Sequence, residues 1–224
     1  MENRSVLEEY KKCTQEAFDY PEIPMGPWSS HSLINDPRHL AFVLSRYKFC
    51  AKMLEGKGLV VEVGSGDGFG IPIIAQTVKQ VLCVDWDERN LDGCARRLKH
   101  LKNVSFKKVD LNQETLNVQA DAVFSIDVIE HIEPENENRF MKNLCSMMEK
   151  ESVLITGTPN IHSSPYACKS SEILHINLKS PKTLRELTLR YFQYEFSFGM
   201  NDEVLHTGFG PMCHYLWSIG AHKK

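Results

Sequence analysis

The sequence lacks any apolar run that approaches the roughly 20 residues that a membrane-spanning helix needs. Its first residues, Met1-Glu2-Asn3-Arg4, do not lead into the apolar core of a secretory signal peptide. These two absences predict a cytoplasmic protein without a membrane span. At 224 residues, the chain is expected to form one domain with additions.

The sequence also lacks closely paired cysteines, because none of its seven cysteines belongs to a Cys-x-x-Cys motif. The odd number argues against a fully paired disulfide framework. Several cysteines lie in apolar runs, as Cys83 does between Leu82 and Val84. We therefore expect reduced, buried cysteines, as in other cytoplasmic proteins.

An excess of positive charge is absent as well. The 26 lysines and arginines are outnumbered by 29 acidic residues, which gives a net charge of −3. A chain with this balance has no global basic field to attract a long nucleic acid, although a local basic patch remains open. The charge therefore favours a small-molecule partner over a nucleic acid.

The most informative stretch is residues 59–70, Leu-Val-Val-Glu-Val-Gly-Ser-Gly-Asp-Gly-Phe-Gly. Four apolar β-forming residues surround one acid, Glu62, as in a buried parallel strand. Glycine then occupies every second position from Gly64 onward, which allows a tight turn and lets a ligand lie against bare backbone. Residues 69–78 have a helical pattern, so the turn should aim N–H groups of a helix N-terminus at the ligand. The alternative is an incidental glycine turn.

Beyond this stretch, strand and helix patterns alternate along the chain. Strands separated by helices of roughly ten residues indicate βαβ units and a parallel sheet. Strands are predicted at 58–63, 80–85, 104–109, 120–125, 152–157, 191–200 and 211–222, and helices at 69–78, 88–100, 136–148 and 182–190. The predicted fold class is therefore α/β, with helices on both faces of a mostly parallel, Rossmann-like sheet.

The N-terminal part is predicted to be helical with one interruption. Apolar residues recur at helical spacing over 2–19, and a second helix is expected to begin at 36–37, Asp-Pro. Between them, residues 20–28 contain three prolines and a glycine, which exclude helix there. The interruption is either a connecting loop or a lid over the active site. Its candidate ligand-contacting side chains are Trp28, Ser29, Ser30 and His31.

The spacing of the glycines distinguishes two nucleotide-binding patterns. In a Gly-x-Gly-x-x-Gly dinucleotide site, the third glycine falls one position later than Gly68 does here. The acid at Glu62, two residues before Gly64, would repel a pyrophosphate but can hydrogen-bond an amino group. The run resembles motif I, acid-x-Gly-x-Gly-x-Gly, of the class I S-adenosylmethionine (SAM)-dependent methyltransferases.

Further acids follow at later strand ends. Asp85 can accept both ribose hydroxyls of a nucleoside, Trp86 can stack on adenine, and Asp110 can accept the adenine amino group. With the fourth strand, these motifs extend the resemblance over residues 58–157. The resemblance implies a seven-stranded sheet with an antiparallel last strand, SAM as methyl donor, and an acceptor pocket at the carboxyl edge. The predicted cofactor-binding residues are Glu62, Gly64, Ser65, Gly66, Asp85, Trp86, Asp110, Leu111 and Asp127.

We divide the chain accordingly. Residues 1–57 hold N-terminal helices and a substrate lid, and residues 58–224 form the SAM-binding core. Within the core, 158–180 and 200–211 are expected to be substrate-side loops. The resemblance does not identify the acceptor.

Residues 127–131, Asp-Val-Ile-Glu-His, resemble the acid-x-x-Glu-His run of two groups of O-methyltransferases. One group acts in ubiquinone biosynthesis, and the other methylates the terminal 2′-hydroxyl of small RNAs. In the RNA group the run supplies metal ligands that a later histidine joins. The resemblance thus implies a divalent cation such as Mg²⁺ at Glu130, His131 and His175, donors that suit such a cation. The sequence departs from that group by Asp127 in place of Glu, and it lacks the RNA-binding extensions.

Methyl transfer to a hydroxyl also needs a way to remove a proton, because the hydroxyl pKa lies far above 7. His131 is the first candidate for base or metal ligand, since its unperturbed pKa lies near neutral, and Glu130 stands beside it. His162, in the loop after the fifth strand, is the next candidate. The alternatives are a His131 ring bonded to its own backbone and an exposed His162 without function.

The leading hypothesis is a SAM-dependent methyltransferase that O-methylates a small hydroxylated metabolite or a sugar unit of a glycan precursor. A metal-dependent RNA ribose 2′-O-methyltransferase and a non-catalytic SAM-binding subunit are the alternatives. An N-methyltransferase is disfavoured, because no Asn-Pro-Pro-aromatic run follows the fourth strand.

Overall fold

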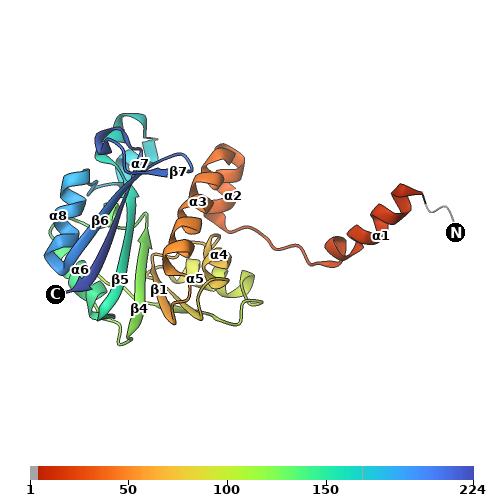
Figure 1. Cartoon of the computed structure of the whole chain (residues 1–224), viewed down its shortest axis with the longest axis horizontal. Coiled ribbons are helices and arrows are strands. Elements are labelled where there is room, and N and C mark those ends of the chain that lie inside the picture. The colour runs from red at the N-terminus through yellow and green to blue at the C-terminus, as the bar shows by residue number, and fades with distance from the viewer. Residues whose placement is uncertain (1–4, 168) are drawn as a thin grey trace.

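The computed structural model of the chain describes residues 5–167 and 169–224, and its centre is an eight-stranded sheet with helices on both faces (Figure 1). The strands lie in the order β3-β2-β1-β4-β5-β8-β6-β7. The first five strands in that order are parallel, and β8 runs antiparallel to both of its neighbours. The strands are β1 Leu59–Val63, β2 Gln80–Asp85, β3 Val104–Lys108, β4 Ala120–Ile126, β5 Met148–Pro159, β6 Phe192–Asn201, β7 Val204–His206 and β8 Tyr215–Lys223. The predicted fold class is confirmed.

The order of strands reverses at β1, which lies between β2 and β4. Val63 at the end of β1 pairs with Val84 on one side and with Ser125 on the other. The carboxyl ends of these three strands therefore meet at one edge. In open α/β sheets, a ligand binds in the crevice outside the carboxyl ends at this reversal point. A ligand site is therefore expected among the residues that follow β1, β2, β3 and β4.

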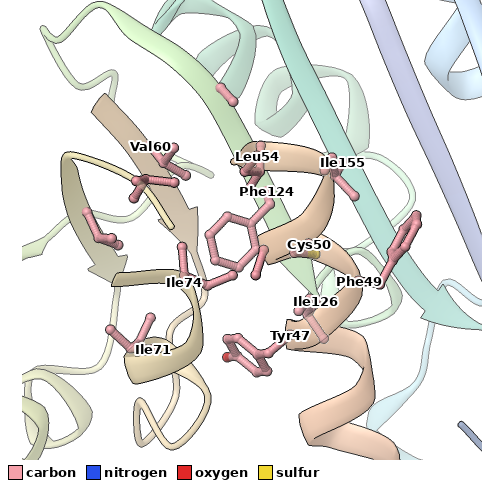
Figure 2. Close-up of a cluster of buried hydrophobic side chains, with 14 of the residues drawn as sticks. Tyr47, Phe49, Cys50, Leu54, Val60, Ile71, Ile74, Phe124, Ile126 and Ile155 are labelled. Carbon is pink, nitrogen blue, oxygen red and sulfur yellow. The ribbon is translucent and has the colours of Figure 1, made fainter. Parts of the chain in front are cut away.

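Helices cover both faces of the sheet, whereas the N-terminal helix α1 stands apart from it (Figure 1). The helices are α1 Val6–Asp19, α2 Pro27–Asn35, α3 Pro37–Leu54, α4 Ile71–Ala75, α5 Glu88–Arg97, α6 Glu137–Ser146, α7 Lys169–Leu174 and α8 Pro181–Tyr191. Successive strand residues face opposite layers, so that Val60 packs with α3 and α4 while Val61 packs with α6. Figure 2 shows the α3 side, where Tyr47, Leu54 and Phe124 fill the space between helix and sheet.

Helix α1 stands apart from the rest of the chain (Figure 1). None of its described residues is buried, and a capping box between Ser5 and Glu8 begins it. The structure confirms the predicted helix over Val6–Asp19, and residues 2–4 of that prediction lie outside the described part of the chain. The second predicted N-terminal helix is confirmed as α3.

Three local predictions were wrong. Helix α2 begins at Pro27, inside the segment predicted to exclude helix, because proline at the first helical position gives up no hydrogen bond. The helix predicted at 69–78 is only Ile71–Ala75 long, since glycines continue to Gly70. The connection at 200–211 contains an additional short strand, β7, so the sheet has eight strands.

The structure also bears on the predictions about membrane-spanning helices and cysteines. Across residues 5–167 and 169–224, no helix is long and apolar enough to cross a membrane. The described cysteines are all free, and they are buried except for Cys13. Cys168 lies outside the described residues.

Candidate active site

The turn after β1 presents bare backbone at the carboxyl edge. Gly64 and Gly66 have positive φ angles of 79° and 52°, a conformation that L side chains rarely adopt. A Cβ atom on Gly64 would lie 2.2 Å from Cγ2 of Val128, which follows β4. Glycine is therefore required where the turn meets the end of the neighbouring strand. Ser65 between them is buried, and its hydroxyl has no hydrogen-bond partner among the described residues.

Glu62, the acid of β1, is buried beneath this turn. Its Oε1 accepts a hydrogen bond of 2.6 Å from the Tyr47 hydroxyl of α3. Its Oε2 is buried and has no partner in the described part of the chain. Burial raises the pKa of Glu62 to about 8, because a charged carboxylate is poorly solvated there. The group is thus largely protonated at neutral pH in this state.

Asp85 at the end of β2 is already fixed by backbone donors. The N–H of Asp87 donates to its Oδ1 at 2.8 Å, and the N–H of Gly66 donates to its Oδ2 at 3.0 Å. The carboxylate therefore joins the tip of β2 to the glycine turn. Trp86 beside it is 67% exposed, which leaves an aromatic face open at this edge.

The segment after β3 supplies a second acid, Asp110, which is half-buried. It accepts hydrogen bonds of 2.9 Å from the Asn112 backbone and from the Gln113 side chain. Leu111 next to it is buried. Asp85 and Asp110 thus follow neighbouring parallel strands, as predicted for a nucleoside site. Their assignment to ribose and adenine stays a prediction.

Helix α2 lies against the glycine turn. The Ser29 backbone and hydroxyl both donate to the carboxylate of Asp67, at 2.7 and 3.2 Å. The Trp28 indole N–H donates to Asn90 of α5 at 3.3 Å. The candidate lid residues Trp28 and Ser29 therefore meet the turn, whereas His31 is exposed. This helix links the N-terminal part to the cofactor side of the edge.

Asp127, which follows β4, has a positive φ of 56° and points its carboxylate at α3. Arg46 donates to its Oδ2 at 2.7 Å, and the guanidinium lies 3.9 Å from the centre of the Tyr215 ring. Arg46 and Tyr215 were missed in the sequence, because the first lies 81 residues from Asp127 and no local pattern marks it. The predicted cofactor contact of Asp127 remains a prediction, since its described ion pair is with Arg46.

The next residues bring together three of the predicted site residues. Glu130 is fully buried, its Oε2 accepts from the Thr158 hydroxyl at 2.9 Å, and its Oε1 has no partner within the described residues. One ligand atom each from Glu130, His131 and His175 lie within 4.8 Å of one another. Burial raises the pKa of Glu130 to about 8, and the nearby carboxylate of Asp127 adds to the shift. One carboxylate and two imidazoles form a donor set that suits a borderline divalent cation.

The two histidine rings are oriented by the surrounding chain. The Nδ1 atom of His131 lies 3.0 Å from the carbonyl oxygen of Leu174, so Nδ1–H donates to that oxygen and Nε2 is the ring nitrogen left to face a ligand. The alternative in which His131 bonds its own backbone is therefore wrong. The ring centres of His131 and His175 are 5.1 Å apart. Burial lowers the pKa of His175, and the His131 ring acts in the same direction, so neutral imidazole is favoured.

A polar groove of about 720 Å³ opens beside His131. It is lined by Asp110, Asn112, Gln113, His131, Glu133, Asn136, Arg139 and Ile176. The groove thus runs between the end of β3 and the Glu130–His131–His175 cluster. His162 is exposed at the start of the short helix Ile161–Tyr166 and does not belong to that cluster.

Similarity to known proteins agrees with this geometry. Residues 60–151 match the family described as a methyltransferase domain. A probable S-adenosylmethionine-dependent methyltransferase of Mycobacterium tuberculosis is 29% identical over 101 residues, which cover 45% of this chain and 35% of the relative. The match therefore spans about a third of the relative's length.

Solved structures share the fold over a larger part of the chain. The methyltransferase domain of bacterial CtHen1 superposes with a TM-score of 0.65 at 18% identity, covering 80% of this chain and 99% of that one. The complex of DhpI with SAH gives a TM-score of 0.60 at 16% identity, covering 96% and 94% of the two chains. At these identities the likeness concerns the fold alone, and a special relation to ubiquinone-biosynthesis enzymes remains a prediction. Residues 60–151 are thus similar to a methyltransferase domain, and the sheet that contains them has the fold of SAM-dependent methyltransferases.

Proposed function

We propose that the protein transfers the methyl group of SAM to a hydroxyl of a small, polar acceptor, with help from a divalent cation. The observation that supports this proposal is the cluster of Glu130, His131 and His175, whose ligand atoms lie within 4.8 Å. A buried carboxylate oxygen without a partner is costly, and a cation would satisfy it. Nitrogen and sulfur nucleophiles have less need of such a group, because a neutral amine is already nucleophilic and a thiol loses its proton far more readily than a hydroxyl.

The residues of the cluster fit a cation in donor type, with one carboxylate and two imidazoles. The bond to Leu174 occupies Nδ1 of His131, so Nε2 is the nitrogen that could bind a cation, and the lowered pKa of His175 favours its neutral form. Two imidazoles with one carboxylate favour Mn²⁺ over Mg²⁺, since imidazole is a softer ligand than water or carboxylate. The cation would supply Lewis acidity that makes an acceptor hydroxyl easier to deprotonate.

The chain's own residues would orient the acceptor. The groove beside His131 is lined almost entirely by polar side chains, and its volume of about 720 Å³ is within the range of small-ligand sites. Such a lining suits a polyhydroxylated metabolite or a sugar unit. An RNA ribose offers the same hydroxyl chemistry, but the net charge of −3 disfavours a long polyanion.

Titration with Mn²⁺ tests the proposal, first without any acceptor. We expect one site per chain, and we expect Glu130→Gln to weaken Mn²⁺ binding at least about 100-fold, because it removes the ligand charge. Glu135→Gln, an exposed glutamate of the same loop, is the matched control and should bind as the native chain does. Radiolabelled methyl transfer to a panel of hydroxylated acceptors should then fall in excess chelator and recover with Mn²⁺. Full activity in chelator would remove the cation from the mechanism, and saturable binding of short RNA at low salt would favour the ribose acceptor.

A further inference from the structure

The segment that carries His175 has almost no apolar anchorage. Residues 160–179 leave the sheet after β5 and return to the same point, where Asn160 and Lys179 form a parallel bridge. Between these ends, none of the side chains that the structure describes is buried. A loop held this weakly by the core has many conformations to lose on ordering. Its polar contacts therefore decide where His175 lies.

Glu130, by contrast, is fixed. Its side chain is fully buried and bonded to Thr158 of β5. A cation site that uses both Glu130 and His175 needs the loop to be held at a constant distance from this part of the core. Two backbone contacts provide part of that link: the Asn177 N–H donates to the Glu130 carbonyl at 2.9 Å, and His131 bonds Leu174.

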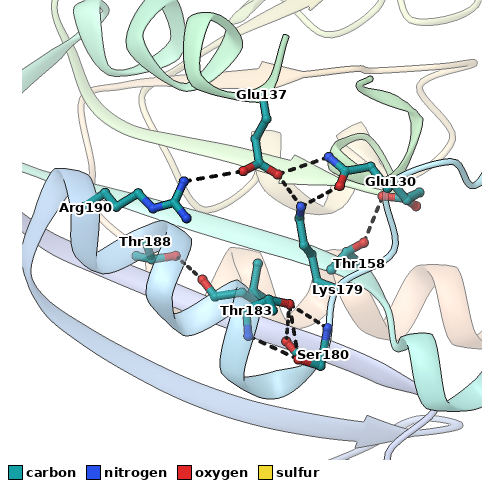
Figure 3. A network of polar contacts seen from close by, with 10 residues as sticks. Glu130, Glu137, Thr158, Lys179, Ser180, Thr183, Thr188 and Arg190 are labelled. Carbon is teal, nitrogen blue, oxygen red and sulfur yellow. Dashed lines mark hydrogen bonds and ion pairs between the residues drawn. The ribbon is translucent and has the colours of Figure 1, made fainter. Parts of the chain in front are cut away.

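The remaining link is a buried polar network of three residues, Glu137, Asn177 and Lys179, which we call the Glu137 network. Glu137 lies in the first turn of α6, and its carboxylate forms an ion pair with the Lys179 ammonium (Figure 3). The side-chain amide of Asn177 donates to the same carboxylate at 3.0 Å and accepts from Lys179 at 2.7 Å. The side chains of Lys179 and Glu137 are only 7% and 14% exposed. The ion pair is thus held away from solvent, and the half-buried Asn177 bonds both of its members.

We propose that the Glu137 network positions His175 for cation binding, so that Glu137, Asn177 and Lys179 act as positioning residues of the proposed site. This inference rests on the cation in the proposed function. The network joins α6, a helix of the core, to residues two and four positions after His175. Removal of one partner of a buried ion pair leaves an uncompensated charge, which would drive the loop out of its position. Second-shell partners of this kind typically change metal affinity 10- to 100-fold.

The experiment compares Lys179→Met with Arg190→Met. Arg190 contacts the same Glu137 carboxylate at 3.8 Å but is 60% exposed, so its loss should leave the network intact. We expect Lys179→Met to weaken Mn²⁺ binding at least about 10-fold with unchanged SAM affinity, and Lys179→Arg to restore most of it. In the metal-free protein, amide hydrogen exchange over 169–179 should speed up about 10-fold in Lys179→Met only.

Each result of this experiment decides a separate question. Native Mn²⁺ affinity in Lys179→Met would overturn the positioning inference while leaving the cation in place. Absence of Mn²⁺ binding in the native chain would instead overturn the cation of the proposed function, and with it the inference. If Lys179→Met does not fold, Asn177→Ala keeps the ion pair and should weaken Mn²⁺ binding about 3- to 10-fold. An unchanged affinity in that variant would also overturn the inference.

Discussion

Two buried glutamates of this protein share nearly the same immediate environment and differ in what lies beyond it. Glu62 is the next-to-last residue of β1, under the glycine turn, and Glu130 follows β4 next to His131, which lines the polar groove. Each accepts one hydrogen bond from a hydroxyl, at 2.6 Å from Tyr47 and at 2.9 Å from Thr158. Each has one oxygen without a partner among the described residues, and burial raises both pKa values to about 8.

The neighbours of the two groups set them apart. The neighbours of Glu62 include Tyr47, Cys50 and Cys83, whose pKa values are raised by burial, so these three remain neutral near pH 7. The carboxylates of Asp67 and Asp85 are also near enough to raise the pKa of Glu62. Around Glu130 stand His131 and His175, which can share a cation with it. Both carboxyl groups are buried, so burial does not distinguish them. The two imidazoles within ligand distance of Glu130 are the difference on which the proposed cation rests.

The largest expected effect is that of Glu62→Gln on how the free energy of unfolding depends on pH. The folded pKa of Glu62, about 8, lies above the ordinary value of 4.5. Its contribution is therefore complete below pH 4.5 and is lost as the pH rises through 8. We expect the native chain to lose about 4 kcal/mol of unfolding free energy relative to Glu62→Gln between pH 5 and pH 8. Urea denaturation at each pH measures this difference.

The same denaturation series with added Mn²⁺ tests whether the two glutamates differ in cation binding. At pH 7.5 the cation should stabilise Glu62→Gln as it stabilises the native chain, because ligands that bind only the folded state raise its stability. It should leave Glu130→Gln unchanged. Equal stabilisation of the two variants by Mn²⁺ would mean that Glu130 does not bind the cation.

A smaller effect is expected at the end of β2. Asp85→Asn removes the charge that would hold the ribose hydroxyls, and hydrogen bonds to charged groups contribute about 1.5–3 kcal/mol. SAM binding measured by calorimetry should weaken roughly 30-fold. Asp92→Asn, an exposed acid of α5, is the matched control. Native affinity in Asp85→Asn would assign the ribose to another group.

The smallest effect concerns the contact between α2 and the turn. Trp28→Ala removes the indole hydrogen bond to Asn90, worth about 1 kcal/mol, and should weaken SAM binding about 5-fold. Tyr20→Ala removes an exposed aromatic residue just outside α1 and should have no effect. Equal affinities of the two variants would separate α2 from the cofactor side.

The sequence predicts the glycine turn after β1 better than the contacts around Glu130 for a physical reason. Glu62 and the glycines that follow are neighbours in the chain, so their spacing records the shape of the turn directly. His175 lies 44 residues after His131, and the resemblance to RNA methyltransferases, not spacing, pointed to it. Arg46 and Lys179 meet their partners only through tertiary contacts. Such contacts leave no periodic pattern in the chain.

The strand order has a consequence for how the protein is made. Because β8 lies between β5 and β6, the hairpin of β6 and β7 reaches the sheet only through the strand that follows it in the chain. During synthesis from the N-terminus, β5 therefore keeps an open edge until residues 215–223 have emerged from the ribosome. The cofactor half can assemble while translation is under way, whereas the other flank waits for the last strand. Unpaired edges of this kind favour association between nascent chains, so chaperones would have most to shield on this flank.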